Sequence, residues 1–140
     1  MSLHDERRTV RDAMSTAVLT IGPTHTLRDA ARLMSVRKVG AAVVMDPERT
    51  HPGIITERDV LDAVAAGQDL DVEQVGAHLT EDIVAASPNW SLNDAASAMV
   101  AGGFRHLVVC EASDVVGMLS VRDVVRVSFA VGPAEPAPTA

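Results

Sequence analysis

The chain contains two copies of one sequence pattern, and this duplication constrains its fold more than any other feature. An apolar helical pattern recurs after 65 residues, where Leu27, Ala30, Ala31 and Met34 are matched by Leu92, Ala95, Ala96 and Met99. Residues 53–60 (GIITERDV) recur 64 positions later as residues 117–124 (GMLSVRDV). A repeat of this length with a one-residue slip indicates two copies of one supersecondary unit. Because a unit of about 60 residues buries only about 60% of its unfolded surface, we expect the two copies to share a core.

Each copy predicts the same order of elements: a short helical lead-in, a short strand, an amphipathic helix, two apolar strands and a closing helix. In the first copy these elements cover residues 10–14, 17–20, 27 onward, 41–45, 53–56 and 57–66. In the second copy they cover 75–79, 83–86, 92 onward, 106–110, 115–120 and 121 to about 130. The prediction is an α+β fold of two β-α-β-β-α repeats related by a pseudo-twofold axis. We place the repeats at 9–70 and 71–130, between a polar arm at 1–8 and a disordered Pro/Ala tail at 131–140.

The composition excludes several classes of function. A net charge of −7, from 19 acidic and 12 basic residues, opposes the positive surface that nucleic-acid binding needs. Aromatic residues make up only 2%, so stacking platforms for single-stranded nucleic acid are nearly absent. No apolar run approaches the ~18 residues of a membrane span, no signal-peptide core follows the polar start, and the single Cys110 cannot form an internal disulfide. We therefore expect a cytoplasmic protein that binds neither nucleic acid nor membrane.

Neither catalysis nor metal binding is predicted. The histidines show no H-x-x-H or H-E-x-x-H spacing, and no cysteine pair lies near them. No G-x-x-x-x-G-K-[ST] loop is present for phosphoryl transfer, and no nucleophile stands beside a general base. We expect that the chain is not an enzyme.

Four predicted helices begin with a Ser or Thr three positions before an Asp, which is the capping-box pattern. The pairs are Thr26/Asp29, Thr56/Asp59, Ser91/Asp94 and Ser120/Asp123. At Thr56 and Ser120 an apolar strand ends where a helix begins, so free backbone N–H groups and the helix dipole favour a phosphate there. A carboxylate three residues on can accept two hydrogen bonds from a ribose diol. Helix capping and ligand contact are both open for Asp59 and Asp123, and the two roles can coexist.

The repeated motif and the order of elements resemble a pair of CBS domains, the arrangement called a Bateman module. The resemblance covers residues 9 to 130 and rests on two matches at equivalent places. It implies a regulatory module that binds an adenosine-containing ligand, AMP, ADP or ATP, in a cleft between the repeats, with no required cofactor. It also implies that the motif Asp bonds the ribose hydroxyls while the motif Thr or Ser faces ribose or phosphate. On this chain those residues are Thr56, Asp59, Ser120 and Asp123.

The resemblance further implies an adenine slot between apolar strand residues. We expect Val18 and Leu19 to form it in one half, and Ile83 and Val84 in the other. Each of these residues is equally consistent with an ordinary place in the core.

The two copies differ in the basic residues that could reach a phosphate. In the second copy Arg105 and His106 lie at the start of the second strand, whereas Lys38 is the only basic residue at the equivalent place in the first copy. Arg58 and Arg122 stand one residue before each motif Asp, where they could clamp a phosphate or form surface ion pairs. The difference predicts one strong site, in the second copy.

We interpret the chain as a stand-alone module that forms a homodimer and passes the bound state of its ligand to a regulated partner protein. One alternative is a ligand-free interaction or dimerisation module whose motif residues serve only as helix caps. Another is a binder of S-adenosylmethionine or NAD.

Overall fold

The computed structural model describes residues 8–129, so the predicted tail at 131–140 and nearly all of the predicted arm lie outside the described residues. The chain divides into two compact units. One is Thr16–Ala85, and the other combines residues 8–15 with residues 86–129. Each unit contains a three-stranded sheet with helices, which confirms the predicted α+β fold of two repeats.

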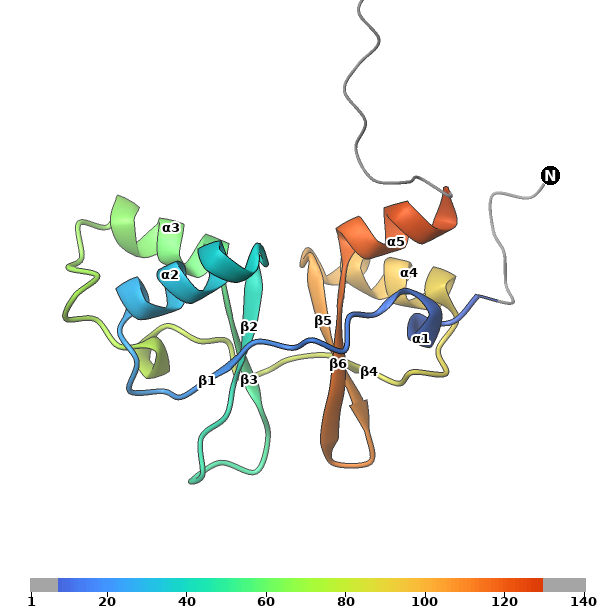
Figure 1. Cartoon of the computed structure of the whole chain (residues 1–140), viewed down its shortest axis with the longest axis horizontal. Helices are drawn as coiled ribbons and strands as arrows, with labels where there is room; N and C mark the ends of the chain where they lie inside the picture. The colour runs from blue at the N-terminus through green and yellow to red at the C-terminus, as the bar shows by residue number, and fades with distance from the viewer. Residues whose placement is uncertain (1–7, 130–140) are drawn as a thin grey trace, which may run out of the picture. The chain divides into compact units, whose positions relative to one another are not determined.

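The Thr16–Ala85 unit has the strand order β1-β2-β3, with β1 parallel and β3 antiparallel to β2. Its helices α2 and α3 lie side by side, as Figure 1 shows. Leu27, Ile55 and Val75 are completely buried in its core. The elements are β1 (Thr20–Ile21), α2 (Leu27–Arg37), β2 (Ala41–Val44), β3 (Gly53–Thr56), α3 (Glu57–Ala65) and the 3-10 helix η1 (Val75–Ala77).

The second unit repeats this plan with the strand order β4-β5-β6. Helix α1 packs against both α4 and α5 (Figure 1). Val10, Leu107 and Leu119 are buried in its core. The elements are α1 (Val10–Ala13), β4 (Ala85–Ala86), α4 (Leu92–Gly102), β5 (His106–Glu111), β6 (Asp114–Ser120) and α5 (Val121–Ser128).

The lead-in segments are exchanged between the two sequence repeats. Residues 8–15 precede the first repeat but pair with the second, since the Ser15 and Met118 backbones bond each other in both directions at 2.9 Å. The segment before β4 pairs with the first repeat in the same way, through Thr80 and Ile54 at 2.9 and 3.0 Å. The expectation of one shared core is therefore corrected. Residues 8–129 form two core clusters, and each takes residues from both repeats.

The main strands and helices agree with the sequence predictions, and the short lead-in elements differ. β1 begins at Thr20 rather than at residue 17, because only Thr20 and Ile21 pair with β2. β4 is confined to Ala85–Ala86. The helical piece predicted at 75–79 is a 3-10 turn over Val75–Ala77, and α5 ends at Ser128.

Candidate functional site

The two motif helices begin with the same hydrogen-bonded arrangement. The Thr56 N–H donates to Asp59 Oδ2 at 2.8 Å, while Thr56 Oγ1 accepts from the Asp59 N–H at 3.4 Å. The corresponding distances at Ser120 and Asp123 are 2.9 and 3.1 Å. Both pairs are half-buried. The capping interpretation is therefore confirmed at both places, and each carboxylate is held in a fixed orientation.

Further first-turn donors of these helices are already engaged by the protein. The Glu57 N–H donates to the Gly40 carbonyl and the Val121 N–H donates to the Arg105 carbonyl, each at 2.9 Å. The expectation that these helix starts present free backbone N–H groups is corrected to this extent, because the loop before β2 or β5 caps them. What a ligand could meet here is chiefly side-chain chemistry.

The two carboxylates differ in the partner of Oδ1, the oxygen that does not accept from Thr56 or Ser120. Asp59 Oδ1 has no partner among residues 8–129. Asp123 Oδ1 lies 3.2 Å from the Arg126 guanidinium, whose Nη2 also donates to the Ala13 carbonyl at 3.4 Å. Arg126 did not emerge from the sequence motif. The signal was the i, i+3 spacing from Asp123, and the equivalent position in the first repeat is Asp62.

The basic candidates lie in different relations to the motif. His106 is the cross-strand partner of Ser120, and the Arg105 backbone bonds the first residue of α5, so these residues and Asp123 come together in one unit. Lys38 is the exposed, left-handed C-cap of α2, two residues before Gly40. Arg58 and Arg122 are exposed at the second position of α3 and α5.

The predicted adenine-slot residues share one compact unit. Leu19 is buried, Val18 and Ile83 are half-buried, and Val84 is exposed. The sequence prediction places one pair in each half, and this is corrected. Both pairs fall in Thr16–Ala85, because the segment before β4 is anchored to β3 through Thr80.

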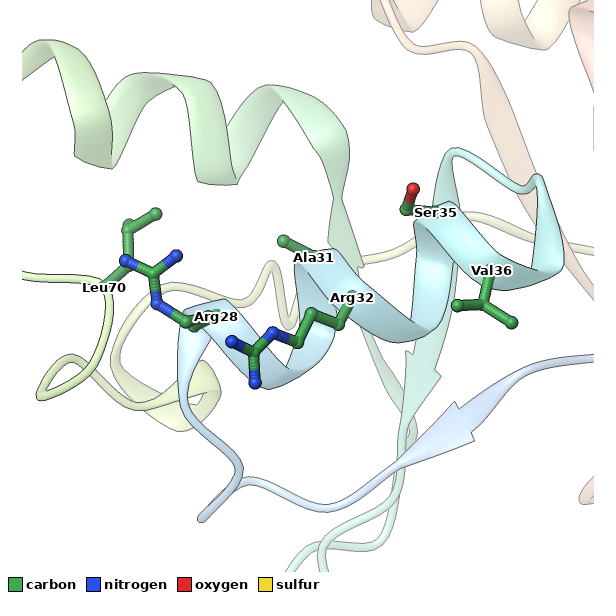
Figure 2. A pocket seen from close by; sticks show the side chains of 6 residues that line it. All are labelled: Arg28, Ala31, Arg32, Ser35, Val36 and Leu70. Atoms are coloured by element: carbon green, nitrogen blue, oxygen red, sulfur yellow. The ribbon is translucent and has the colours of Figure 1, made fainter.

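A separate hollow of about 380 Å³ lies beside α2 (Figure 2). None of the predicted ligand residues lines it. Its walls are Arg28, Ala31, Arg32, Ser35, Val36 and Leu70. Arg28 is paired with Asp71 at one end. The hollow is therefore distinct from the motif junctions.

Other chemistry is sparse in the described part of the chain. Burial raises the pKa of the half-buried Cys110 thiol, which disfavours the reactive thiolate. Within residues 8–129 no three His, Cys, Asp or Glu side chains are grouped to hold a metal ion. No helix in that range has the length and apolar character required to cross a membrane.

Comparisons with known proteins match both repeats. The CBS domain family model matches residues 10–66 and again residues 72–130. The CBS domain-containing protein YhcV of Bacillus subtilis is 33% identical over 115 residues, which covers 81% of each chain. A CBS domain protein from Pyrobaculum aerophilum, solved in complex with AMP, is 27% identical with a TM-score of 0.75, covering 82% of this chain and 88% of that one. A hexameric CBS-CP12 protein from bloom-forming cyanobacteria is 25% identical with a TM-score of 0.82, covering 91% and 76%.

Proposed function

We propose, since this chain belongs to the CBS-domain family, that it is a regulatory binding module for an adenosine-containing ligand, AMP, ADP or ATP. The ligand is held at the motif junctions, and the bound state is passed to a partner protein. A ligand achieves this only by binding two arrangements of the protein with different affinities. The proposed role is signalling and not catalysis, and its setting is the cytoplasm.

The arrangement of the Asp59 carboxylate carries the proposal. Thr56 fixes one oxygen through its N–H and its hydroxyl, at 2.8 and 3.0 Å, while the other oxygen has no partner in the described chain. Such a carboxylate is oriented in advance to accept hydrogen bonds from a vicinal diol. Hydrogen bonds to charged groups contribute about 1.5–3 kcal/mol each. The AMP complex of the Pyrobaculum relative supports an adenosine ligand.

The remaining contacts are assigned by position and chemistry. We assign the phosphate to Arg105 and His106 in the second repeat, with Lys38, Arg58 and Arg122 as further candidates. The adenine is assigned to the apolar residues Val18, Leu19, Ile83 and Val84. Leu19 is almost completely buried, so its part in a slot would be confined to its backbone.

The ribose assignment is tested by removing each motif carboxylate. We expect Asp59→Ala and Asp123→Ala each to weaken AMP binding at the affected site by roughly 10- to 100-fold, measured by calorimetric titration. Asp29→Ala is the matched control, because Asp29 forms the same capping box at α2 outside the motif. If all three variants bind AMP like the wild type, the motif carboxylates serve only as caps and the ribose assignment is wrong.

The ligand class is tested by a thermal-shift screen with AMP, ADP, ATP, S-adenosylmethionine and NAD. A ligand that binds only the native state adds about 2.7 kcal/mol at 100 times its Kd, which is a readily measured shift. A shift with AMP, ADP or ATP supports the proposal. A shift with S-adenosylmethionine or NAD alone, or with none of the five, favours one of the alternatives.

We also propose that the chain associates with copies of itself. Each unit has a helix with exposed apolar side chains, Leu61 and Val64 on α3, and Val125 on α5 together with its C-cap residue Phe129. Apolar groups exposed along one helix commonly mark an interaction surface. The hexameric cyanobacterial relative supports self-association, and a dimer is the simplest closed assembly.

A further inference from the structure

The two motif carboxylates differ in whether they form an ion pair with a basic side chain. In the second repeat, Arg126 stands one helical turn after Asp123 and lies 3.2 Å from its Oδ1. In the first repeat the same position holds Asp62, an exposed acid that offers Asp59 no hydrogen-bond donor. The two sites therefore differ at the atom that the proposed function assigns to the ribose.

We propose that Arg126 is a latch on the second site, a positioning residue that must release Asp123 before a ribose diol can bind it fully. The inference rests on the proposed function, since it concerns the same carboxylate. The latch makes Asp59 in the first repeat more available to the ribose hydroxyls than Asp123 in the second. The phosphate-binding candidates Arg105 and His106 nevertheless belong to the second repeat.

The geometry around Arg126 supports a latch that can open. Its side chain is 53% exposed, whereas that of Asp123 is 15% exposed, so the guanidinium lies on the solvent side of a mostly covered carboxylate. Arg126 Nη2 also donates to the Ala13 carbonyl at 3.4 Å, which holds the guanidinium near its position over the carboxylate. Because the guanidinium is half-exposed, water screens this ion pair in part, and it is weak enough for a ligand to displace.

Electrostatics predicts the direction of the effect. The inner oxygen, Oδ2, already accepts from the Ser120 N–H at 2.9 Å. With the positive Arg126 guanidinium 3.2 Å from Oδ1, both oxygens of Asp123 already have a protein partner, so the carboxylate is a weaker acceptor for the hydrogen bonds of a ribose diol. Asp59 keeps one oxygen free of that competition.

The test uses adenosine as the probe, because it carries the ribose diol but no phosphate that could attract Arg126. Asp59→Ala silences the first site, and the full chain is titrated with adenosine and with 2′-deoxyadenosine. We expect Arg126→Gln in this background to tighten adenosine binding by about 2- to 5-fold, the range given by exposed ion pairs. The preference of this double variant for adenosine over 2′-deoxyadenosine should rise by the same factor.

Two further variants separate the latch from general effects of charge and stability. Arg11→Gln removes a charge from the same unit away from the motif, and should leave adenosine binding unchanged. Asp62→Arg, in an Asp123→Ala background, installs an arginine one turn after Asp59 and should weaken adenosine binding at the first site. This second variant does not depend on the Arg126 contact with α1, so it tests the latch even if Arg126→Gln lowers stability.

The outcomes distinguish the latch from the proposed function. If Asp123→Ala removes adenosine binding at its site but Arg126→Gln leaves that affinity unchanged or weaker, the latch is wrong and the proposed function stands. If neither motif Asp affects adenosine or AMP binding, the proposed function fails first. Tighter adenosine binding by Arg126→Gln together with weaker binding by Asp62→Arg supports the latch.

Discussion

At the scale of single residues, the motif glycines are required by the backbone that crosses them. A Cβ on Gly117 would lie 2.7 Å from Met14 Sδ and 3.0 Å from the Ser15 carbonyl oxygen. A Cβ on Gly53 would lie 2.7 Å from Leu79 Cδ1 and 3.1 Å from the Thr80 carbonyl oxygen. In each case the neighbour is the lead-in segment of the other sequence repeat. The glycine that begins each motif is therefore required for folding, independently of any ligand that the later motif residues bind.

Replacing Gly117 by alanine should consequently destabilise the protein. Because the Ser15 backbone can move away only by breaking its bonds to Met118, we expect Gly117→Ala to lower the free energy of unfolding by about 1–3 kcal/mol, measured by urea denaturation. Gly22→Ala is the control, since a Cβ there meets only His25, at an ordinary 3.6 Å. Equal midpoints for the two variants would contradict the steric explanation.

At the scale of elements, the paired helices α2 and α4 are capped unequally. At α2 the Asp29 carboxylate accepts from the Thr26 N–H and the Thr26 hydroxyl accepts from the Asp29 N–H, both at 3.1 Å. At α4 the Ser91 hydroxyl accepts from the Asp94 N–H at 3.0 Å, and the Asp94 carboxylate makes no bond back among the described residues. Hydrogen bonding from the Thr26 backbone, and then from its side chain, lowers the pKa of Asp29 below its usual 3.8.

The lowered pKa of Asp29 predicts a pH-dependent contribution to stability. Since the folded state has the lower pKa, ionised Asp29 stabilises the protein above pH 3.8, and this contribution is lost as the pH falls through the folded value. We expect Asp29→Asn to lower the melting temperature at neutral pH and to converge with the wild type in acid. Asp94→Asn should change the neutral melting temperature less. A constant Asp29→Asn difference at all pH values would contradict this account.

Element type followed directly from the sequence wherever local chemistry decides it. The apolar runs of β2 and β3 and the hydroxyl caps at Thr26 and Thr56 gave the elements nearly to the residue, since burial and capping act over short distances. The exchange of lead-in segments was missed because both copies carry the same pattern, so the sequence does not say which sheet each lead-in joins. The Arg126 contact was not predicted because Arg126 lies after the repeated motif, at a position where the first copy has Asp62.

At the scale of the whole molecule, neither sequence repeat completes a core by itself. The core cluster of the first unit includes Val75, which lies outside the predicted first repeat at 9–70. The cluster of the second unit includes Val10 and Ala13, which precede the second repeat and belong to the first. The segments that close each core therefore come from the other copy. A 9–70 fragment would lack Val75 and the Thr80 backbone that pairs with Ile54.

Self-association also belongs to the scale of the whole molecule, because apolar side chains along α5 are not buried in the core of their own unit. Val121, Val125 and Phe129 recur every four residues along one face, with Val125 45% and Phe129 58% exposed. If this face binds a second copy, a buried carboxylate there is strongly unfavourable. We expect the wild type to show a multiple of 14.7 kDa by light scattering and Val125→Glu to shift toward the monomer. Val100→Glu is the control, since Val100 on α4 is 84% exposed. Monomeric wild-type protein with and without AMP, or an equal effect of both variants, would remove α5 as the assembly surface.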